Sequence, residues 1–191
     1  FRNEIFLISK SFIATSNFNE DKNLALQLII ATIPIIILGY IFRDLISQRI
    51  FSINDIAISN IIFASILLFA FLNNKGKKTL INITILGACF IGLFQCFALI
   101  PGASRSGAAI TAGLLIGLSL KDASKFAFLL AIPTILGALT LLIFDLNNGN
   151  VSFDLFNISI GFFTSMIFAF FTIKLFLKLV EKIGMIPFVA Y

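Results

Sequence analysis

The chain is 191 residues long, which would suit one soluble domain, but 59% of its residues are hydrophobic and only 12% are charged. A soluble domain carries about 25% charged residues, so the composition excludes that class. The formal net charge is +5, yet the basic residues form no stripe interleaved with aromatics, which argues against nucleic acid as a partner. The absence of histidine excludes a His base, a His metal ligand and a Ser-His-Asp triad.

Long apolar runs follow one another along the chain, and a helix needs about 20 such residues to cross a bilayer. The runs lack the alternation of a membrane barrel, so helices must span the bilayer. We therefore expect an all-α integral membrane protein, a polytopic helical bundle forming a single transmembrane domain over residues 1–191. Four clear spans are predicted, at 24–42, 55–72, 126–144 and 155–180.

Two further apolar segments, 80–100 and 104–118, are separated by Pro101 and Gly102. The second is short for a span. It fits a re-entrant helix or one half of a broken helix.

Two stretches about 100 residues apart resemble each other, "ATIPIIILG" at 31–39 and "LAIPTILG" at 130–137. An internal repeat would explain the match, and repeats often place a site at their interface. Chance similarity among Ile- and Leu-rich helices explains it equally well.

The lysines lie in short connections and at one chain end, and positive residues favour the cytoplasmic side. If every apolar segment crosses or turns back once, the three lysine groups share one side, predicted cytoplasmic. The segment 101–107 then faces the extracytoplasmic side, although Arg43 and Arg49 on that same side weaken the assignment. The three groups are Lys75, Lys77 and Lys78; Lys121 and Lys125; and Lys174, Lys178 and Lys182.

Cys89 and Cys96 are seven residues apart, on one face of a predicted membrane helix. Small packing residues are the favoured interpretation. A disulfide or a metal pair has little support from this spacing.

The segment "PGASRSG" places an arginine inside this apolar sequence. Pro101 and Gly102 end one helix, and Ser104 suits the N-cap of the next. Unpaired amides and the dipole of a helix N-terminus attract anions, and the guanidinium of Arg105 matches phosphate oxygens. With the hydroxyls of Ser104 and Ser106, the pattern predicts a site for phosphate or another oxyanion.

A ridge of small residues follows, at Ala109, Gly113 and Gly117, and predicts close packing against a neighbouring helix. That packing would bury the Arg105 end inside the bundle. The alternative for Arg105 is a snorkelling side chain at a span end or a partner of a structural carboxylate.

These residues resemble a known family. "FQCFALIPGASRSGAAITAG", "SLKDASKFAFLLAIPTILGA" and the ending "KIGMIPFVAY" are similar to undecaprenyl-diphosphatases, the BacA-type bacitracin-resistance proteins, over essentially the whole chain. The resemblance implies a helical bundle with inverted repeats and re-entrant helices in the bacterial inner membrane. It also implies an active site that opens to the extracytoplasmic side.

The implied reaction is hydrolysis of undecaprenyl diphosphate to undecaprenyl phosphate and inorganic phosphate, which recycles the lipid carrier for peptidoglycan and confers bacitracin resistance. The motif carries over residue by residue: Ser104 and Arg105 as catalytic residues, and Gly102, Ser104, Arg105 and Ser106 as diphosphate-binding residues. The family also implies a divalent cation, Mg or Ca. Whether the chain forms a homo-oligomer is left open.

The chain departs from the family pattern in three places. Ala109 stands where the family has threonine, and Thr111 lies about 200° further round the helix. Lys125 stands where relatives carry glutamate. The acidic first motif, which would hold the metal, is absent and expected upstream of Phe1, so we expect an N-terminally truncated chain that is weak or inactive alone.

The remaining carboxylates lie near span ends or in connections, so solvated roles are favoured over catalytic ones. A transporter or flippase for a lipid phosphate or small anion is the alternative function. A purely structural membrane subunit would leave "GASRSG" unexplained. The carboxylates are Glu4, Glu20, Asp21, Asp44, Asp55, Asp122, Asp145, Asp154 and Glu181.

Overall fold

The computed structural model describes residues 19–47, 51–146 and 154–190, and within them every regular element is a helix. The prediction of an all-α polytopic membrane protein is confirmed. Glu4, Arg49 and the "NNGN" turn lie outside the described residues. The helices are α2 (Asn19–Ile41), α3 (Arg43–Ser47), α4 (Ile53–Asn73), η1 (Leu80–Asn82), α5 (Ile85–Gln95), η2 (Cys96–Leu99), α6 (Arg105–Leu115), α7 (Leu120–Leu146), α8 (Leu155–Ile183) and α9 (Ile186–Ala190).

Four helices are long and apolar enough to cross a membrane, and they correspond to the four predicted spans: α2, α4, α7 and α8. The two segments on either side of Pro101 and Gly102 are different. α5 and α6 have 11 residues each, so each is only about 16 Å long, too short to span. They form a hairpin of short helices. A short helix is expected for 104–118, but 80–100 is expected as one span and is instead divided into η1, α5 and η2.

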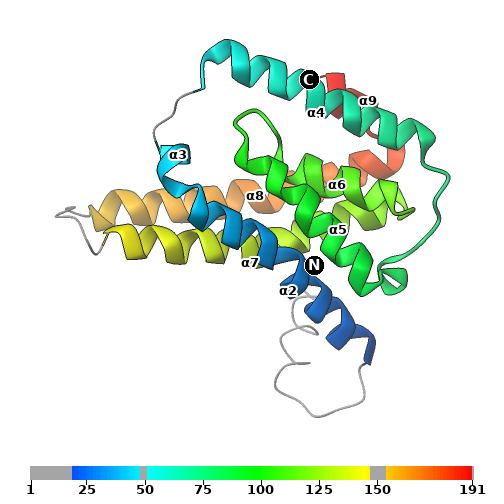
Figure 1. Cartoon of the computed structure of the whole chain (residues 1–191), viewed down its shortest axis with the longest axis horizontal. Coiled ribbons are helices and arrows are strands. Elements are labelled where there is room, and N and C mark those ends of the chain that lie inside the picture. Colours follow the sequence, from blue (N-terminus) through cyan, green and yellow to red (C-terminus); the bar gives the residue numbers. More distant parts are fainter. Residues whose placement is uncertain (1–18, 48–50, 147–153, 191) are drawn as a thin grey trace.

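The hairpin lies in the middle of the bundle (Figure 1). α5 packs on α2, α6 packs on α7, and α2 and α7 also contact each other; α4 covers the other side of α6. The buried core accordingly centres on the hairpin, with Ala88 and Ile91 of α5, Ile110 of α6, and Phe126 and Leu130 of α7. The resembling stretches of α2 and α7, each with a proline, thus flank the hairpin on neighbouring helices.

The helices of the hairpin pack closely against their neighbours, as the ridge of small residues predicts. A Cβ on Gly113 would come within 2.9 Å of the Cβ of Ala123 on α7. A Cβ on Gly92 of α5 would come within 2.7 Å of the Cα of Ala31 on α2. The prediction that Gly117 extends the ridge is wrong, because α6 ends at Leu115 and Gly117 turns the chain with φ +89°.

Polar side chains decide where the helices begin. Ser52 and Asp55 form a capping box on α4, the hydroxyl of Thr84 accepts from the amide of Gly87 on α5, and Asp154 accepts from two amides of α8. α7 begins at Leu120, six residues before the predicted start, because the Ser119 hydroxyl accepts from the Asp122 amide at 3.1 Å. The sequence pattern showed only the apolar part of that helix.

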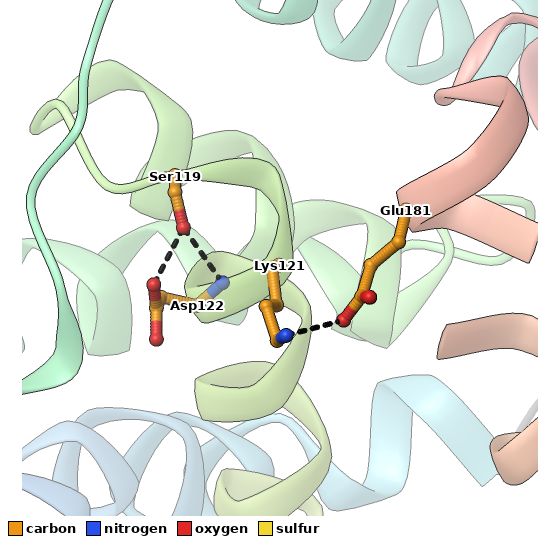
Figure 2. Close-up of polar contacts among 4 residues, drawn as sticks. All are labelled: Ser119, Lys121, Asp122 and Glu181. Carbon is orange, nitrogen blue, oxygen red and sulfur yellow. Dashed lines mark hydrogen bonds and ion pairs between the residues drawn. The ribbon is translucent and has the colours of Figure 1, made fainter. Parts of the chain in front are cut away.

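The lysine-rich connections meet at one end of the bundle. The backbone of Lys78 exchanges hydrogen bonds with Gly117 and Ser119, joining the loop after α4 to the loop before α7. Figure 2 shows Lys121 of α7 paired with Glu181 of α8, with 2.8 Å between Nζ and Oε1. The start of α7 and the end of α8 therefore lie beside the loop that holds Lys78.

We predict that Gly92→Ala destabilises the protein while Gly161→Ala does not. The added methyl group at residue 92 meets the backbone of α2, whereas a Cβ on Gly161 of α8 has no atom within 4 Å. Overpacking of this kind costs about 1–3 kcal/mol. Thermal unfolding in detergent measures the difference, and equal midpoints for the two variants would contradict the packing described here.

Candidate functional site

A sharp turn brings the chain from η2 to the start of α6. The amide of Ala103 donates to the carbonyl of Ile100, and Gly102 has φ +97°, which favours glycine. A Cβ on Gly102 would collide with the carbonyl oxygen of Ile56 on α4. Gly102 therefore lets the turn press against α4; a contact between Gly102 and a ligand stays a prediction.

Ser104 caps α6, as the sequence predicts. Its hydroxyl oxygen accepts from the amide of Gly107 at 3.2 Å and lies 3.4 Å from the hydroxyl oxygen of Ser106. The amides of Arg105 and Ser106, in the first turn, have no carbonyl acceptor within the helix. The N-terminus of α6 thus keeps the two donors that an anion would use.

The side chain of Arg105 lines a cavity of about 610 Å³ between α2, α3, η2 and α7. The side chain is half-buried, and no hydrogen bond or ion pair joins its guanidinium to the described part of the chain. A structural carboxylate partner is thus not seen there. A desolvated guanidinium without a protein partner is costly unless a ligand provides the negative charge.

A second arginine, Arg43 of α3, lines the same cavity, together with Thr134 of α7. The other described residues in the lining are apolar, and none of these described residues is a carboxylate. They are Ile35, Ile36, Gly39, Ile46, Ala98, Leu99, Ala138, Leu141 and Leu142. The cavity thus combines apolar walls with two positive charges.

Thr134 is held in place by a buried bond between two helices. Its hydroxyl donates to the carbonyl of Leu130 at 2.7 Å and accepts from the side-chain amide of Gln95 on α5 at 3.3 Å. Both residues are buried. The hydroxyl hydrogen of Thr134 is therefore donated within its own helix, and the side chain is a fixed, weakly polar part of the cavity wall.

An apolar cavity of about 400 Å³ adjoins the first and shares Ile46 and Leu99 with it. Its other described walls are Leu38 of α2, Leu45 of α3, Leu93 of α5, Cys96 and Phe97 of η2, and Phe42, Phe51 and Ile100 from the connections. Cys89 and Cys96 are both free thiols, which agrees with a packing role.

The predicted site residues are adjacent in the chain but face different neighbours. Arg105 faces the cavity, Ser104 caps the helix and is exposed, and Ser106 lies beside Ser104. Gly102 contacts α4. Only Arg105 among these four lines the cavity, so direct ligand contacts by Gly102, Ser104 and Ser106 stay predictions.

Ala109, at the position where the resemblance leads us to expect a threonine, is buried in the core one turn beyond Arg105. Thr111 does not replace it. Its hydroxyl donates to the carbonyl of Gly107 at 2.8 Å and is buried on another face of α6.

Five carboxylates have described contacts, and these contacts are helix caps or ion pairs; the side chains of Glu20, Asp21 and Asp145 are not described. Asp55, Asp122 and Asp154 bond at helix starts, Glu181 pairs with Lys121, and Asp44 lies 3.6 Å from Arg43. No group of three His, Cys, Asp or Glu side chains that could hold a metal occurs among the residues searched, which are the described ones.

The arrangement can hold a polyanion whose other end is apolar. Arg105 and the free amides of α6 supply donors to oxyanions, and the adjoining cavity accepts hydrocarbon. Sequence reasoning missed Arg43, which it used only as evidence on membrane orientation. In the sequence, Arg43 is marked only as a basic residue directly after an apolar span.

Comparison with known proteins adds independent findings. A family model described as bacitracin resistance protein BacA matches residues 1–191. The undecaprenyl-diphosphatase of Alcanivorax borkumensis is 41% identical over 173 residues, which cover 91% of this chain and 65% of that protein. Those of Alteromonas mediterranea and Ruthia magnifica are 38% and 41% identical, and 73% and 68% of their lengths are covered. The chain thus spans about two thirds of the length of these relatives.

We predict that Ser104→Ala lowers the free energy of unfolding by about 1 kcal/mol, the usual cost of losing a helix cap. Ser104→Asp should keep the cap and the stability. Ser106→Ala is the matched control, because the Ser106 hydroxyl bonds to no backbone amide in the described structure. Thermal unfolding in detergent reads out all three, and a Ser106→Ala loss equal to that of Ser104→Ala would contradict the capping role.

Proposed function

The chain belongs to the bacitracin resistance protein BacA family, and on that premise we propose that the whole protein hydrolyses undecaprenyl diphosphate to undecaprenyl phosphate and inorganic phosphate. In the cell this reaction recycles the lipid carrier used for cell-wall synthesis. The observation that carries the proposal is the guanidinium of Arg105, which faces a cavity at a helix N-terminus without a partner in the described chain.

The proposed reaction breaks a phosphoanhydride bond. A water oxygen bonds to the terminal phosphorus while a proton of that water passes to the solvent, and the electron pair of the broken phosphoanhydride bond leaves with the lipid phosphate. Negative charge accumulates on the phosphoryl oxygens, so fixed positive charge and oriented amides lower the barrier. Arg105 and the first amides of α6 supply both in a cavity with apolar walls, where these interactions are strong.

Ser104 joins the site through its place at the helix start. Its hydroxyl accepts from the Gly107 amide and still has a hydrogen to donate. We assign that hydrogen to a phosphoryl oxygen held by Arg105. Ser106 and Gly102 complete the turn that presents the helix N-terminus.

The divalent cation implied by the family finds no ligand set here. The described residues of the lining include no carboxylate, and the carboxylates whose contacts are described cap helices or pair with cations. The described residues therefore do not fit Mg or Ca, and no step of this mechanism runs through a metal.

A transporter of a lipid phosphate is the less favoured function. Broken helices and a helix N-terminus directed at an anion suit a transporter as well. The relatives at 38–41% identity are nevertheless named as diphosphatases.

We place the cavity on the extracytoplasmic side of the bacterial inner membrane. Support comes from α7, where Leu141 and Leu142 line the cavity while Lys121 lies in the first turn. Twenty residues of helix separate Lys121 from Leu141, a distance of about 30 Å. The cavity and the lysine-rich end are therefore on opposite sides of the bundle.

We expect Arg105→Ala in the full-length protein to lower kcat/KM for phosphate release from undecaprenyl diphosphate by about 100-fold or more, the usual effect of removing one donor to developing negative charge. Arg105→Lys should retain part of the activity, since lysine keeps the positive charge but cannot form the paired hydrogen bonds of a planar guanidinium. Lys77→Ala, an exposed cation in the loop after α4, is the control. An unchanged rate in a folded Arg105→Ala protein would refute the proposed mechanism.

For the membrane orientation, single cysteines at residues 44 and 77 are compared in a background with Cys89→Ala and Cys96→Ala. A membrane-impermeant maleimide added to intact spheroplasts should label the Asp44→Cys protein and leave the Lys77→Cys protein unlabelled until the cells are lysed. The reverse pattern would place the cavity on the cytoplasmic side.

A further inference from the structure

We propose that Arg43 is a second diphosphate-binding residue and that it holds the phosphate attached to the lipid, while Arg105 holds the terminal phosphate. The inference rests on the proposed function and specifies the site further. Its basis is the shared cavity, into which α3 brings one arginine and α6 brings the other.

Charge balance supports two cationic partners. Phosphate monoesters lose their second proton with a pKa of about 6, so a lipid diphosphate carries a charge of about −2 to −3 at neutral pH. One guanidinium neutralises only part of this charge. Among the described residues of the lining there is no carboxylate, so the two positive charges of Arg43 and Arg105 nearly balance the charge of the diphosphate.

The backbone holds Arg43 in the wall of the cavity. The amides of Phe42 and Ile46 donate to the carbonyls of Leu38 and Phe42, so helical hydrogen bonding continues from α2 into α3. The guanidinium carbon lies 5.0 Å from the centre of the Tyr40 ring. This stacking restricts the positions that the side chain can take.

The ion pair with Asp44 does not prevent phosphate binding. The two side chains are 45% and 86% exposed, and 3.6 Å separates Nε from Oδ1. An exposed pair of this kind is weak, and a diphosphate offers Arg43 more negative charge and a bidentate partner.

The position of the apolar cavity decides which phosphate each arginine holds. Phe42, Leu45 and Ile46, which flank Arg43 in the chain, line that cavity, while no residue of α6 does. A hydrocarbon tail lying there would leave its first phosphate nearest Arg43. The terminal phosphate then reaches Arg105 and the N-terminus of α6.

The test compares wild-type, Arg43→Gln and Arg43→Lys full-length proteins. For Arg43→Gln we expect KM for the lipid diphosphate to rise about 10-fold with kcat within about twofold, since a residue that binds ground and transition states equally affects KM alone. The inhibition constant of the product, a polyprenyl monophosphate, should rise by a similar factor. That of inorganic phosphate should not change, and Arg43→Lys should recover part of the affinity.

Lys77→Gln, which removes one positive charge far from the cavity, is the matched control and should leave all constants unchanged. An Arg43→Gln protein with wild-type KM and wild-type inhibition by the monophosphate would overturn the inference. A rise in the inhibition constant of inorganic phosphate alone would also overturn it, because Arg43 would then hold the terminal group.

A failure of the proposed function has a different signature. If the wild-type protein releases no phosphate, the phosphatase proposal fails, but binding of polyprenyl monophosphate is still measurable as a rise in the unfolding temperature. The inference then requires that this rise be smaller for Arg43→Gln than for the wild type and for Lys77→Gln. Equal rises in all three proteins would overturn it.

Discussion

Backbone contact at two glycines holds the centre of this protein together. Gly92 lets α5 approach Ala31 of α2, and Gly113 lets α6 approach Ala123 of α7. In a bilayer, helices gain little from apolar burial alone, so close packing of small residues is a main source of association. Two helices too short to span the membrane are therefore retained inside the bundle, and the site depends on that retention.

Burying the hairpin creates an electrostatic problem that shapes the site. The N-terminus of α6 and the guanidinium of Arg105 bring positive charge among apolar walls, where an uncompensated charge is costly. Capping by Ser104 satisfies only one amide. The proposed substrate, with a diphosphate head and a hydrocarbon tail, would compensate the charge and fill the adjoining apolar cavity.

Most helices follow from local residue patterns, because apolar length and capping chemistry act within one segment. The spans, the break at Pro101 and Gly102, and the cap at Ser104 are of this kind. The prediction failed in two places for different reasons. Gly117 leaves the helix in a turn whose carbonyl accepts from the amide of Lys78, a residue of another segment. α7 starts before its apolar part because Ser119 caps it locally, and the polar residues of that first turn carry no hydropathy signal.

The sequence by itself determined that this is a helical membrane protein. It also indicated Arg105, beside Ser104 at a helix start, as the main candidate for binding an anion. Only the tertiary structure decided what surrounds Arg105: Arg43 from 62 positions earlier in the chain and Thr134 held by Gln95. The physical reason is that caps and spans depend on near neighbours in the chain. A cavity is formed by side chains of several helices, and the spacing of residues within one segment does not indicate which helices pack together.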